Sequence, residues 1–248
     1  MTISDTVADQ KPITIPHNDC GRCLLLIGDS YGTERVSAVT DEKVSLAETW
    51  PVQLALAAEK SGWQTDLDFA SYRMLIETAQ MVAARPRNPH ICIVQAGIVD
   101  IFPRTLPLAA SKSRSTFFRI LRRVIRRVRP IWIRFVYWRP WVAERDLESA
   151  WLQLRQSCGH LILVTYPALA HLHASEHPDS QAALDRLNSL IRKFCEEHEN
   201  VSCCDLALYI QARGEQTHAV ASSDSHLTRR GNEYLFRLAA NLLLVQND

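Results

Sequence analysis

The chain has 248 residues, 47% of them hydrophobic, and this length suits one domain with a full hydrophobic core. Its 8 glycines and 11 prolines exclude a collagen-like or low-complexity chain. The formal net charge of +1 conceals an uneven distribution, since residues 101–143 contain 11 of the 28 Lys and Arg residues and no Asp or Glu, which leaves 17 basic and 27 acidic residues elsewhere.

Short apolar runs and helical periodicity alternate along the chain. In chain order we predict a strand over 23–27, a helix over 49–62, a strand over 64–69, a helix over 72–84, a strand over 91–96, helices over 116–128 and 144–157, a strand over 160–165, a helix over 180–197, a strand over 200–205 and a helix over 228–244. Alternating strands and helices form βαβ units, whose right-handed crossovers put helices on both faces of a parallel sheet. The pattern therefore predicts one α/β domain over 20–248: a doubly wound, three-layer αβα fold with a flavodoxin-like sheet of five parallel strands.

An insertion is predicted at about 105–143, where the basic excess lies. Within it, 116–128 has an apolar stripe at helical spacing, and arginines fill most of the other positions. Three interpretations stay open. The stripe packs on the body or on a second subunit of a homodimer, the segment 114–139 contacts an anionic membrane surface, or it binds an anionic or carrier-linked substrate. Nucleic acid is disfavoured, because no known binding motif accompanies the arginines.

Residues 1–19 are expected to form a loose leader. They have no basic start followed by an apolar core, so they do not look like a secretory signal, and no run of about 18 apolar residues predicts a transmembrane helix. The seven cysteines are odd in number and scattered, which favours a reducing cytoplasm, with peripheral membrane contact as the variant. Cys20 and Cys23 form a single CxxC pair, which indicates a zinc or redox site less strongly than it indicates cysteines beside buried strands.

Three polar clusters follow predicted strands or precede the last helix. They are Gly28-Asp29-Ser30-Tyr31, Gly97-Ile98-Val99-Asp100 and Asp224-Ser225-His226. In doubly wound sheets, ligands bind at the carboxyl ends of the strands, and this topology can bring the clusters together. A serine needs a base to take its proton, and the base needs an orienting carboxylate. The clusters thus hold the inventory of nucleophilic acyl chemistry.

These blocks resemble those of the SGNH (GDSL-type) hydrolase family, in an order that covers nearly the whole chain. An apolar strand ends in Gly28-Asp29-Ser30, and the closing block Asp224-Ser225-His226 is followed by Gly231-Asn232 and a last apolar helix. The resemblance implies that Ser30 is the nucleophile, His226 the general base and Asp224 the acid that orients the histidine. It also implies a serine-dependent esterase, or a deacylase of glycan or small-molecule esters, with no metal or organic cofactor.

The resemblance further implies an oxyanion hole, and here the sequence departs from the family. Its donors would be the backbone N–H groups of Ser30 and of either Ala70 or Ser71, because no glycine marks the second block. Gly97 opens the third block of the site. The third block of the family carries an asparagine where this chain has Val99, and losing one oxyanion donor costs ~10²–10³ in rate.

The closing block is also altered, because the family usually spaces its acid and histidine as Asp-x-x-His and this chain has Asp224-x-His226. In an extended segment the side chains of residues i and i+2 point the same way, so Asp224 can still orient His226. Two alternatives stay open beside hydrolysis. One is an O-acyltransferase of the same family, and the other is a catalytically weak domain that binds a glycan or a partner.

Four further residues near these blocks have a structural interpretation, and three of them also have a functional one. Arg104 binds an anionic substrate group or replaces the missing oxyanion donor, or it is one more solvated arginine. Tyr31 lines the pocket or covers the end of the sheet. Asp29 is expected to organise its turn, and Asp100 is either a substitute carboxylate or an ordinary turn residue.

Overall fold

The computed structural model describes residues 22–34, 43–71, 73–101, 142–170, 180–222 and 225–244, together with the single positions 115, 117 and 120. The predicted leader 1–19 and most of the insertion 105–143 lie outside the described residues. The same holds for two candidate site residues, Arg104 and Asp224.

Five parallel strands form one sheet in the order β2-β1-β3-β4-β5. They are β1 (Cys23–Gly28), β2 (Gln64–Phe69), β3 (Ile91–Gln95), β4 (His160–Val164) and β5 (Val201–Cys204). The central β1 and β3 are nearly continuous apolar runs because both of their faces are covered. The edge strand β2 stays half exposed and carries Asp66 and Asp68. The predicted flavodoxin-like sheet is confirmed, and its strand order reverses between β1 and β3.

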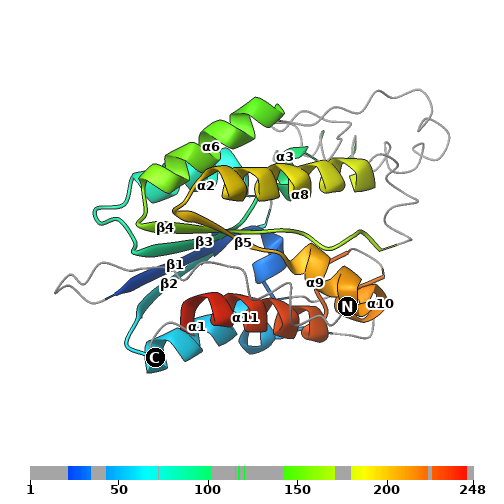
Figure 1. Ribbon diagram of the computed structural model, residues 1–248. Helices are drawn as coiled ribbons and strands as arrows, with labels where there is room; N and C mark the ends of the chain where they lie inside the picture. The colour runs from blue at the N-terminus through cyan, green and yellow to red at the C-terminus, as the bar shows by residue number, and fades with distance from the viewer. Residues whose placement is uncertain are drawn as a thin grey trace.

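Helices cover both faces of the sheet and complete the three layers (Figure 1). On one face lie α1 (Trp50–Lys60) and α11 (Arg229–Leu244), next to α9 (Leu206–Arg213) and α10 (Gln216–Ala219). On the other lie α2 (Leu75–Ala83), α6 (Glu144–Gln156) and α8 (Ser180–Glu197), with the single turn of α3 (Ile98–Ile101) beside α8. Among the helices that the structure describes, none has the length and apolar character needed to span a membrane.

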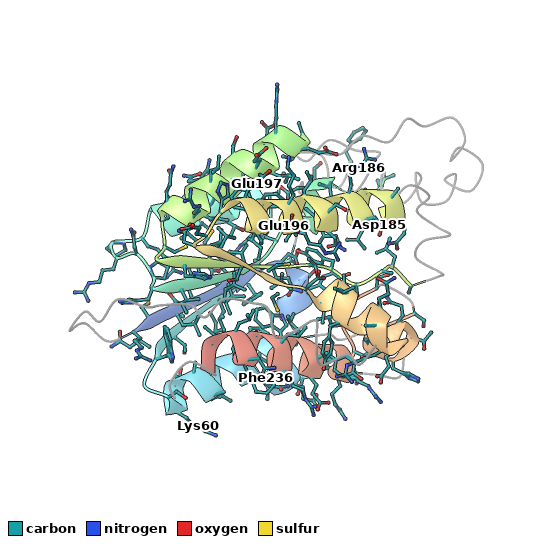
Figure 2. The ribbon with its side chains drawn as sticks, viewed as in Figure 1. Lys60, Asp185, Arg186, Glu196, Glu197 and Phe236 are labelled. Atoms are coloured by element: carbon teal, nitrogen blue, oxygen red, sulfur yellow. The ribbon has the colours of Figure 1, made fainter. Side chains whose placement is uncertain are left out.

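Amphipathic patterning explains how these helices sit on the sheet, and α8 is the clearest case. Its Leu184, Leu187, Ile191 and Phe194 recur at helical spacing and are buried. Charged side chains of the same helix, among them Asp185 and Glu196 (Figure 2), are exposed.

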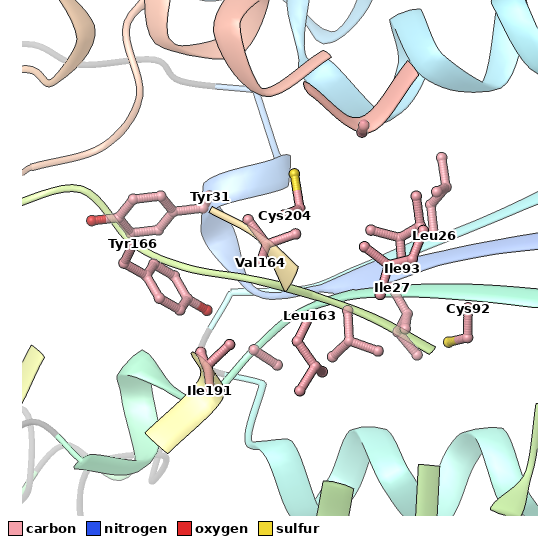
Figure 3. Packing of buried hydrophobic residues seen from close by; sticks show 14 of the residues in the cluster. Leu26, Ile27, Tyr31, Cys92, Ile93, Leu163, Val164, Tyr166, Ile191 and Cys204 are labelled. Atoms are coloured by element: carbon pink, nitrogen blue, oxygen red, sulfur yellow. The ribbon is translucent and has the colours of Figure 1, made fainter. Parts of the chain in front are cut away.

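The strands supply the other half of the core. Figure 3 shows the consecutive Leu163 and Val164 pointing to opposite faces of the sheet, as the two-residue period of a strand requires. Cys92, Cys158 and Cys204 are also buried, and burial raises the pKa of the Cys158 thiol to about 12. Cysteine thus acts as a small hydrophobic residue at these positions.

Individual residues mark the starts of the helices, in different ways. Thr228 is the N-cap of α11, since its Oγ1 accepts a hydrogen bond from Gly231 N at 3.1 Å. Thr49 precedes α1, but its Oγ1 donates to Leu46 O instead of capping that helix. The helix predicted from residue 72 begins at Leu75, because the Glu77 carboxylate accepts from Met74 N and fixes Met74 as the N-cap.

Three short helices, α3, α9 and α10, are not predicted by the periodicity, because four to eight residues are too few to display it. Their ends are nevertheless marked by individual residues. Asp205 accepts from Leu208 N at the start of α9, and Gly214, with φ 64°, ends it.

Candidate active site

The first and last polar blocks meet at the carboxyl ends of the strands. Ser30 begins the turn that follows β1, and His226 lies between α10 and α11, 196 positions later. The Ser30 Oγ and the His226 Nε2 are 3.1 Å apart, which is hydrogen-bond distance. The structure therefore brings together the two residues that the sequence proposes as nucleophile and base.

The turn that presents Ser30 is pressed against β2 and β3. A Cβ atom on Gly28 would lie 2.5 Å from the carbonyl oxygen of Gln95 and 2.8 Å from the Phe69 ring, so only glycine fits. The next residue, Asp29, donates its N–H to Gln95 O at 2.9 Å. Its carboxylate then accepts from Tyr31 N at 3.0 Å, which closes the turn around the serine.

The segment that carries His226 is held by backbone hydrogen bonds on both sides. Ala221 N donates to His226 O at 2.8 Å, and Thr228 N donates to Ala219 O at 3.0 Å. An isolated antiparallel bridge joins Val220 to Leu227. The loop that carries His226 is therefore fixed by backbone hydrogen bonds on both sides of the histidine.

Two of the three predicted backbone donors for an oxyanion remain available. Ala70 N donates to Gly28 O at 3.2 Å, so this N–H is already engaged. The N–H groups of Ser30 and Ser71 make no hydrogen bond with any described residue. Because backbone N–H groups need partners, these two stay open to a ligand.

The third block folds into the single turn of α3. Gly97 begins it with φ 125°, a conformation that favours glycine, and Val99 is buried as an apolar side chain. Both carboxylate oxygens of Asp100 accept from Leu75 N, at 3.1 and 3.0 Å, at the first turn of α2. Burial, aided by the charge of Asp29, raises the pKa of Asp100 to about 7. Asp100 thus holds a helix terminus.

A buried cluster underlies the Ser30–His226 pair. Asp29 is fully buried, and its second oxygen accepts from Tyr166 OH at 3.0 Å. Burial raises the pKa of Asp29 to about 6, although the Tyr31 and Tyr166 donors and the nearby His226 favour the charged form. The Tyr31 ring stacks on the His226 ring with centroids 5.2 Å apart. Tyr31 is only 6% exposed, so its side chain is largely covered at this end of the sheet.

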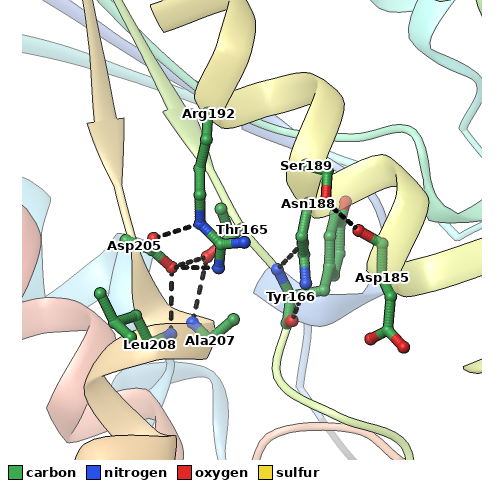
Figure 4. A network of polar contacts seen from close by, with 9 residues as sticks. All are labelled: Thr165, Tyr166, Asp185, Asn188, Ser189, Arg192, Asp205, Ala207 and Leu208. Atoms are coloured by element: carbon green, nitrogen blue, oxygen red, sulfur yellow. Dashed lines mark hydrogen bonds and ion pairs between the residues drawn. The ribbon is translucent and has the colours of Figure 1, made fainter. Parts of the chain in front are cut away.

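Tyr166 is in turn fixed by a polar network at the ends of β4 and β5 (Figure 4). Asn188 accepts from Tyr166 N at 2.9 Å and donates to Tyr166 O at 2.7 Å. Beside it, Asp205 binds Arg192 through two contacts of 2.6 and 3.1 Å and accepts from Thr165 Oγ1. Burial works to raise the pKa of Asp205, but these hydrogen bonds hold it below its usual value.

Sequence reasoning missed this supporting layer. The one feature of the sequence that pointed to Tyr166 was its position directly after a predicted strand. Asn188 and Arg192 lie in an amphipathic helix where they read as ordinary polar residues. Their function depends on which helix face meets which strand end.

Comparisons with known proteins agree with this architecture. Residues 26–234 match the model of the GDSL-like lipase/acylhydrolase family. No curated protein sequence matches the chain.

Several solved structures share the fold at low sequence identity. An acetylxylan esterase from Geobacillus stearothermophilus is 15% identical with a TM-score of 0.56, over 89% of this chain and 93% of that one. A carbohydrate acetylesterase from Sinorhizobium meliloti is 11% identical with a TM-score of 0.56, over 90% and 99%. Phospholipase A1 from Streptomyces albidoflavus is 18% identical with a TM-score of 0.53, over 89% and 99%.

The family match spans most of the chain and begins within the strand that presents Ser30. It ends in the last helix, beyond His226. The chain therefore belongs to the GDSL-like lipase/acylhydrolase family and is a hydrolase of ester bonds.

Proposed function

We propose that the protein is a serine esterase or deacylase that works through a Ser30-His226-Asp224 triad. The observation that carries the proposal is the distance of 3.1 Å between Ser30 Oγ and His226 Nε2. With its proton on Nδ1, His226 presents Nε2 as the acceptor for the Ser30 hydroxyl. Asp224, which lies outside the described residues, is proposed to orient the imidazole and to stabilise its protonated form.

The proposed reaction has two halves. In the first, the Ser30 Oγ–H proton moves to His226 Nε2 as Oγ bonds to the ester carbonyl carbon, and the carbonyl oxygen becomes an oxyanion. The C–O bond to the alcohol then breaks, and the alcohol leaves with the proton from Nε2. In the second, water gives a proton to Nε2 as its oxygen bonds to the acyl carbon; the bond from that carbon to Oγ then breaks and Oγ takes the proton from Nε2, which releases the carboxylic acid and restores the serine.

For the oxyanion we propose the N–H groups of Ser30 and Ser71 as donors. Ala70 is dropped from the proposal because Gly28 O occupies its N–H. Val99 brings no donor to the third block, so the hole is proposed to hold its charge with two backbone groups. Arg104, outside the described residues, stays our candidate for a third donor or for binding an anionic group.

As substrate class we propose acetyl or other short acyl esters of carbohydrates or small molecules. Two of the structural neighbours are described as esterases that act on carbohydrate acetyl groups, and this supports the class. A phospholipase neighbour makes longer lipid esters the alternative. Hydrolysis of p-nitrophenyl acetate, butyrate and decanoate separates them, since a short-acyl site favours the acetate.

Transfer to a second alcohol and ligand binding without turnover remain the other candidates. Transfer would use the same acyl-serine, so adding free sugars to the assay tests it by the appearance of acylated sugar. The short Ser30–His226 contact favours turnover over a binding module. A cytoplasmic location stays a proposal, supported by the absence of disulfide bonds among the described cysteines.

Replacement of Ser30 tests the nucleophile directly. Ser30→Ala removes the only proposed attacking oxygen, so we expect p-nitrophenyl acetate hydrolysis to fall at least ~10³-fold and fluorophosphonate labelling to vanish. Ser189→Ala, an exposed serine on α8, is the matched control and should keep both signals. Full labelling of folded Ser30→Ala would exclude Ser30 as nucleophile. A wild-type protein that neither labels nor hydrolyses any of the three esters would favour the binding module.

A further inference from the structure

The side chain that follows the proposed nucleophile makes two contacts with the segment of the proposed base. The Tyr31 ring lies over the His226 imidazole with an interplanar angle of 24° and a centroid separation of 5.2 Å. The Tyr31 hydroxyl donates to the carbonyl oxygen of Ser225, the residue before His226, at 2.7 Å. One side chain therefore holds both the plane of the imidazole and the backbone that carries it.

Tyr31 is itself fixed from three directions. Its backbone N–H donates to one oxygen of Asp29, and Tyr166 OH donates to the other, at 3.0 Å each. The Tyr31 and Tyr166 rings meet edge to face at 5.1 Å and 88°, and Figure 3 shows the two side by side at the end of the sheet. Asn188 clamps the backbone of Tyr166 on both sides. The ring of Tyr31 thus has little freedom to turn.

The contact to Ser225 falls on a strained residue. Ser225 has φ 60°, in the left-handed region that residues other than glycine, asparagine and aspartate seldom adopt because it is strained. Besides the Tyr31 hydroxyl on its carbonyl, Ser225 N donates to Ala221 O at 3.1 Å and Ser225 Oγ accepts from Ala170 N at 2.9 Å. Such a conformation persists only where several contacts over-determine it, and Tyr31 supplies one of them next to His226.

We propose that Tyr31 is a positioning residue, which keeps His226 Nε2 within proton-transfer distance of Ser30 Oγ by stacking on the imidazole and by holding the Ser225 carbonyl. The inference rests on the proposed function of Ser30 and His226. The Tyr31 side chain is only 6% exposed, and we propose no contact between it and the substrate. Because proton transfer depends steeply on geometry, a displacement of the imidazole by about 1 Å would cost about 10²-fold in rate. Loss of Tyr31 should therefore lower kcat and leave KM unchanged.

Two substitutions separate the ring from the hydroxyl. Tyr31→Phe keeps the stack and removes the hydrogen bond to Ser225, and we expect kcat to fall about 10-fold at unchanged KM. Tyr31→Leu removes both, and we expect kcat to fall about 10²-fold. The phenylalanine variant should therefore keep part of the activity that the leucine variant loses. The rate constant of fluorophosphonate labelling should fall in parallel. Tyr209→Phe, on α9 where the ring meets Tyr234 edge to face, is the control and should match the wild type.

A second readout does not depend on activity. The Cε1–H proton resonance of His226, assigned with His226→Gln, should move downfield in Tyr31→Leu because the ring current of the stacked tyrosine is lost. It should stay near its wild-type position in Tyr31→Phe. Melting temperature and circular dichroism establish that each variant is folded, and Tyr31→Phe keeps the test decisive if Tyr31→Leu does not fold.

The outcomes distinguish the two proposals. If folded Tyr31 variants keep the wild-type kcat, or if KM alone rises, the positioning role is overturned while the triad stands. If the wild type itself is not labelled and turns over no ester, the proposed function fails. In that case the His226 resonance alone tests the positioning role. A chemical shift that is the same in the wild type and in Tyr31→Leu would overturn the placement of the imidazole by Tyr31.

Discussion

Asp29 and Asp100 are two buried carboxyl groups near the site whose charged forms are unfavourable. Burial raises their pKa values to about 6 and about 7, against about 3.9 in an unfolded chain. Each is tied to a backbone donor that its element needs: Tyr31 N in the turn around Ser30, and Leu75 N at the start of α2. These residues organise the site through the backbone, and the cost of burying their charge should appear as a dependence of stability on pH.

That dependence has a definite sign. Because the native pKa values lie above the unfolded ones, the native state binds more protons than the unfolded state between about pH 4 and pH 7. The stabilisation that this proton binding gives the native state is complete below about pH 4, and it is lost as pH rises through the native pKa values. Asp100→Asn keeps an acceptor for Leu75 N but does not titrate. From pH 5 to pH 8 the wild type should therefore lose on the order of 2–3 kcal/mol more unfolding free energy than this variant.

Urea unfolding at both pH values measures the difference. Asp185→Asn, at an exposed carboxylate on α8, is the control and should lose as much as the wild type. A wild type and an Asp100→Asn variant that respond equally to pH would contradict the raised pKa of Asp100.

At the scale of elements, the start of α11 joins the histidine segment to the rest of the fold. Asn232 Oδ1 accepts from Trp50 N at the start of α1, at 2.9 Å, while Asn232 Nδ2 donates to Thr228 O. The Trp50 indole continues the link to Gln95 at the end of β3. One residue earlier, Gly231 packs against α10, where a Cβ would lie 2.1 Å from Ala219 O. The Gly231-Asn232 pair of the closing block is thus explained by close packing and by a bridge between two helices.

Gly231→Ala tests this packing against helix propensity. In an unobstructed helix the change would stabilise by up to about 1 kcal/mol, but here the methyl group meets a backbone carbonyl. We expect a net loss of about 1–3 kcal/mol in unfolding free energy, as overpacking typically costs. Thermal melting checks it, with Asn241→Ala at an exposed position of the same helix as the control, expected to be neutral or slightly stabilising. An unchanged or higher melting temperature for Gly231→Ala would contradict the contact.

For the whole molecule, the uneven charge remains the feature that the catalytic site does not use. The part of the chain that matches the family outside 101–143 is acidic, and the 11 basic residues of that segment follow the third block directly. Arginines on an amphipathic segment with aromatic residues close behind are typical of contact with an anionic surface. We keep membrane contact through 114–139 as a proposal, with packing on a second subunit as the alternative.

Vesicle flotation tests the proposal. The protein should float with phosphatidylserine-containing vesicles at low salt, stay behind with phosphatidylcholine vesicles, and lose binding near 0.5 M salt as screening shortens the reach of each charge. Replacement of Arg122, Arg123, Arg126 and Arg127 by Glu should abolish flotation. A protein that does not float even at low salt, and that sediments as a dimer, would favour the second subunit instead.

Sequence patterns were sufficient to predict the features that depend on neighbouring residues along the chain. The strands β1 and β3, the helices α6 and α8, and the parallel order follow from apolar runs and helical period, because burial on two faces or on one imposes those patterns directly. The residues Ser30 and His226 were also visible, since each stands in a block of recognisable order.

Only the tertiary structure decided which of those residues touch. That Ser30 and His226 meet at 3.1 Å, that Gly28 O engages the N–H of Ala70, that Asp100 binds α2, and that Tyr31 stacks on His226 all depend on contacts between distant segments. A hydrogen bond or a stacked ring needs both partners in position, and each partner alone looks like an ordinary polar or aromatic residue. The sequence therefore determines the elements and the chemical inventory, whereas the packing of strand ends and loops decides the geometry in which that inventory can act.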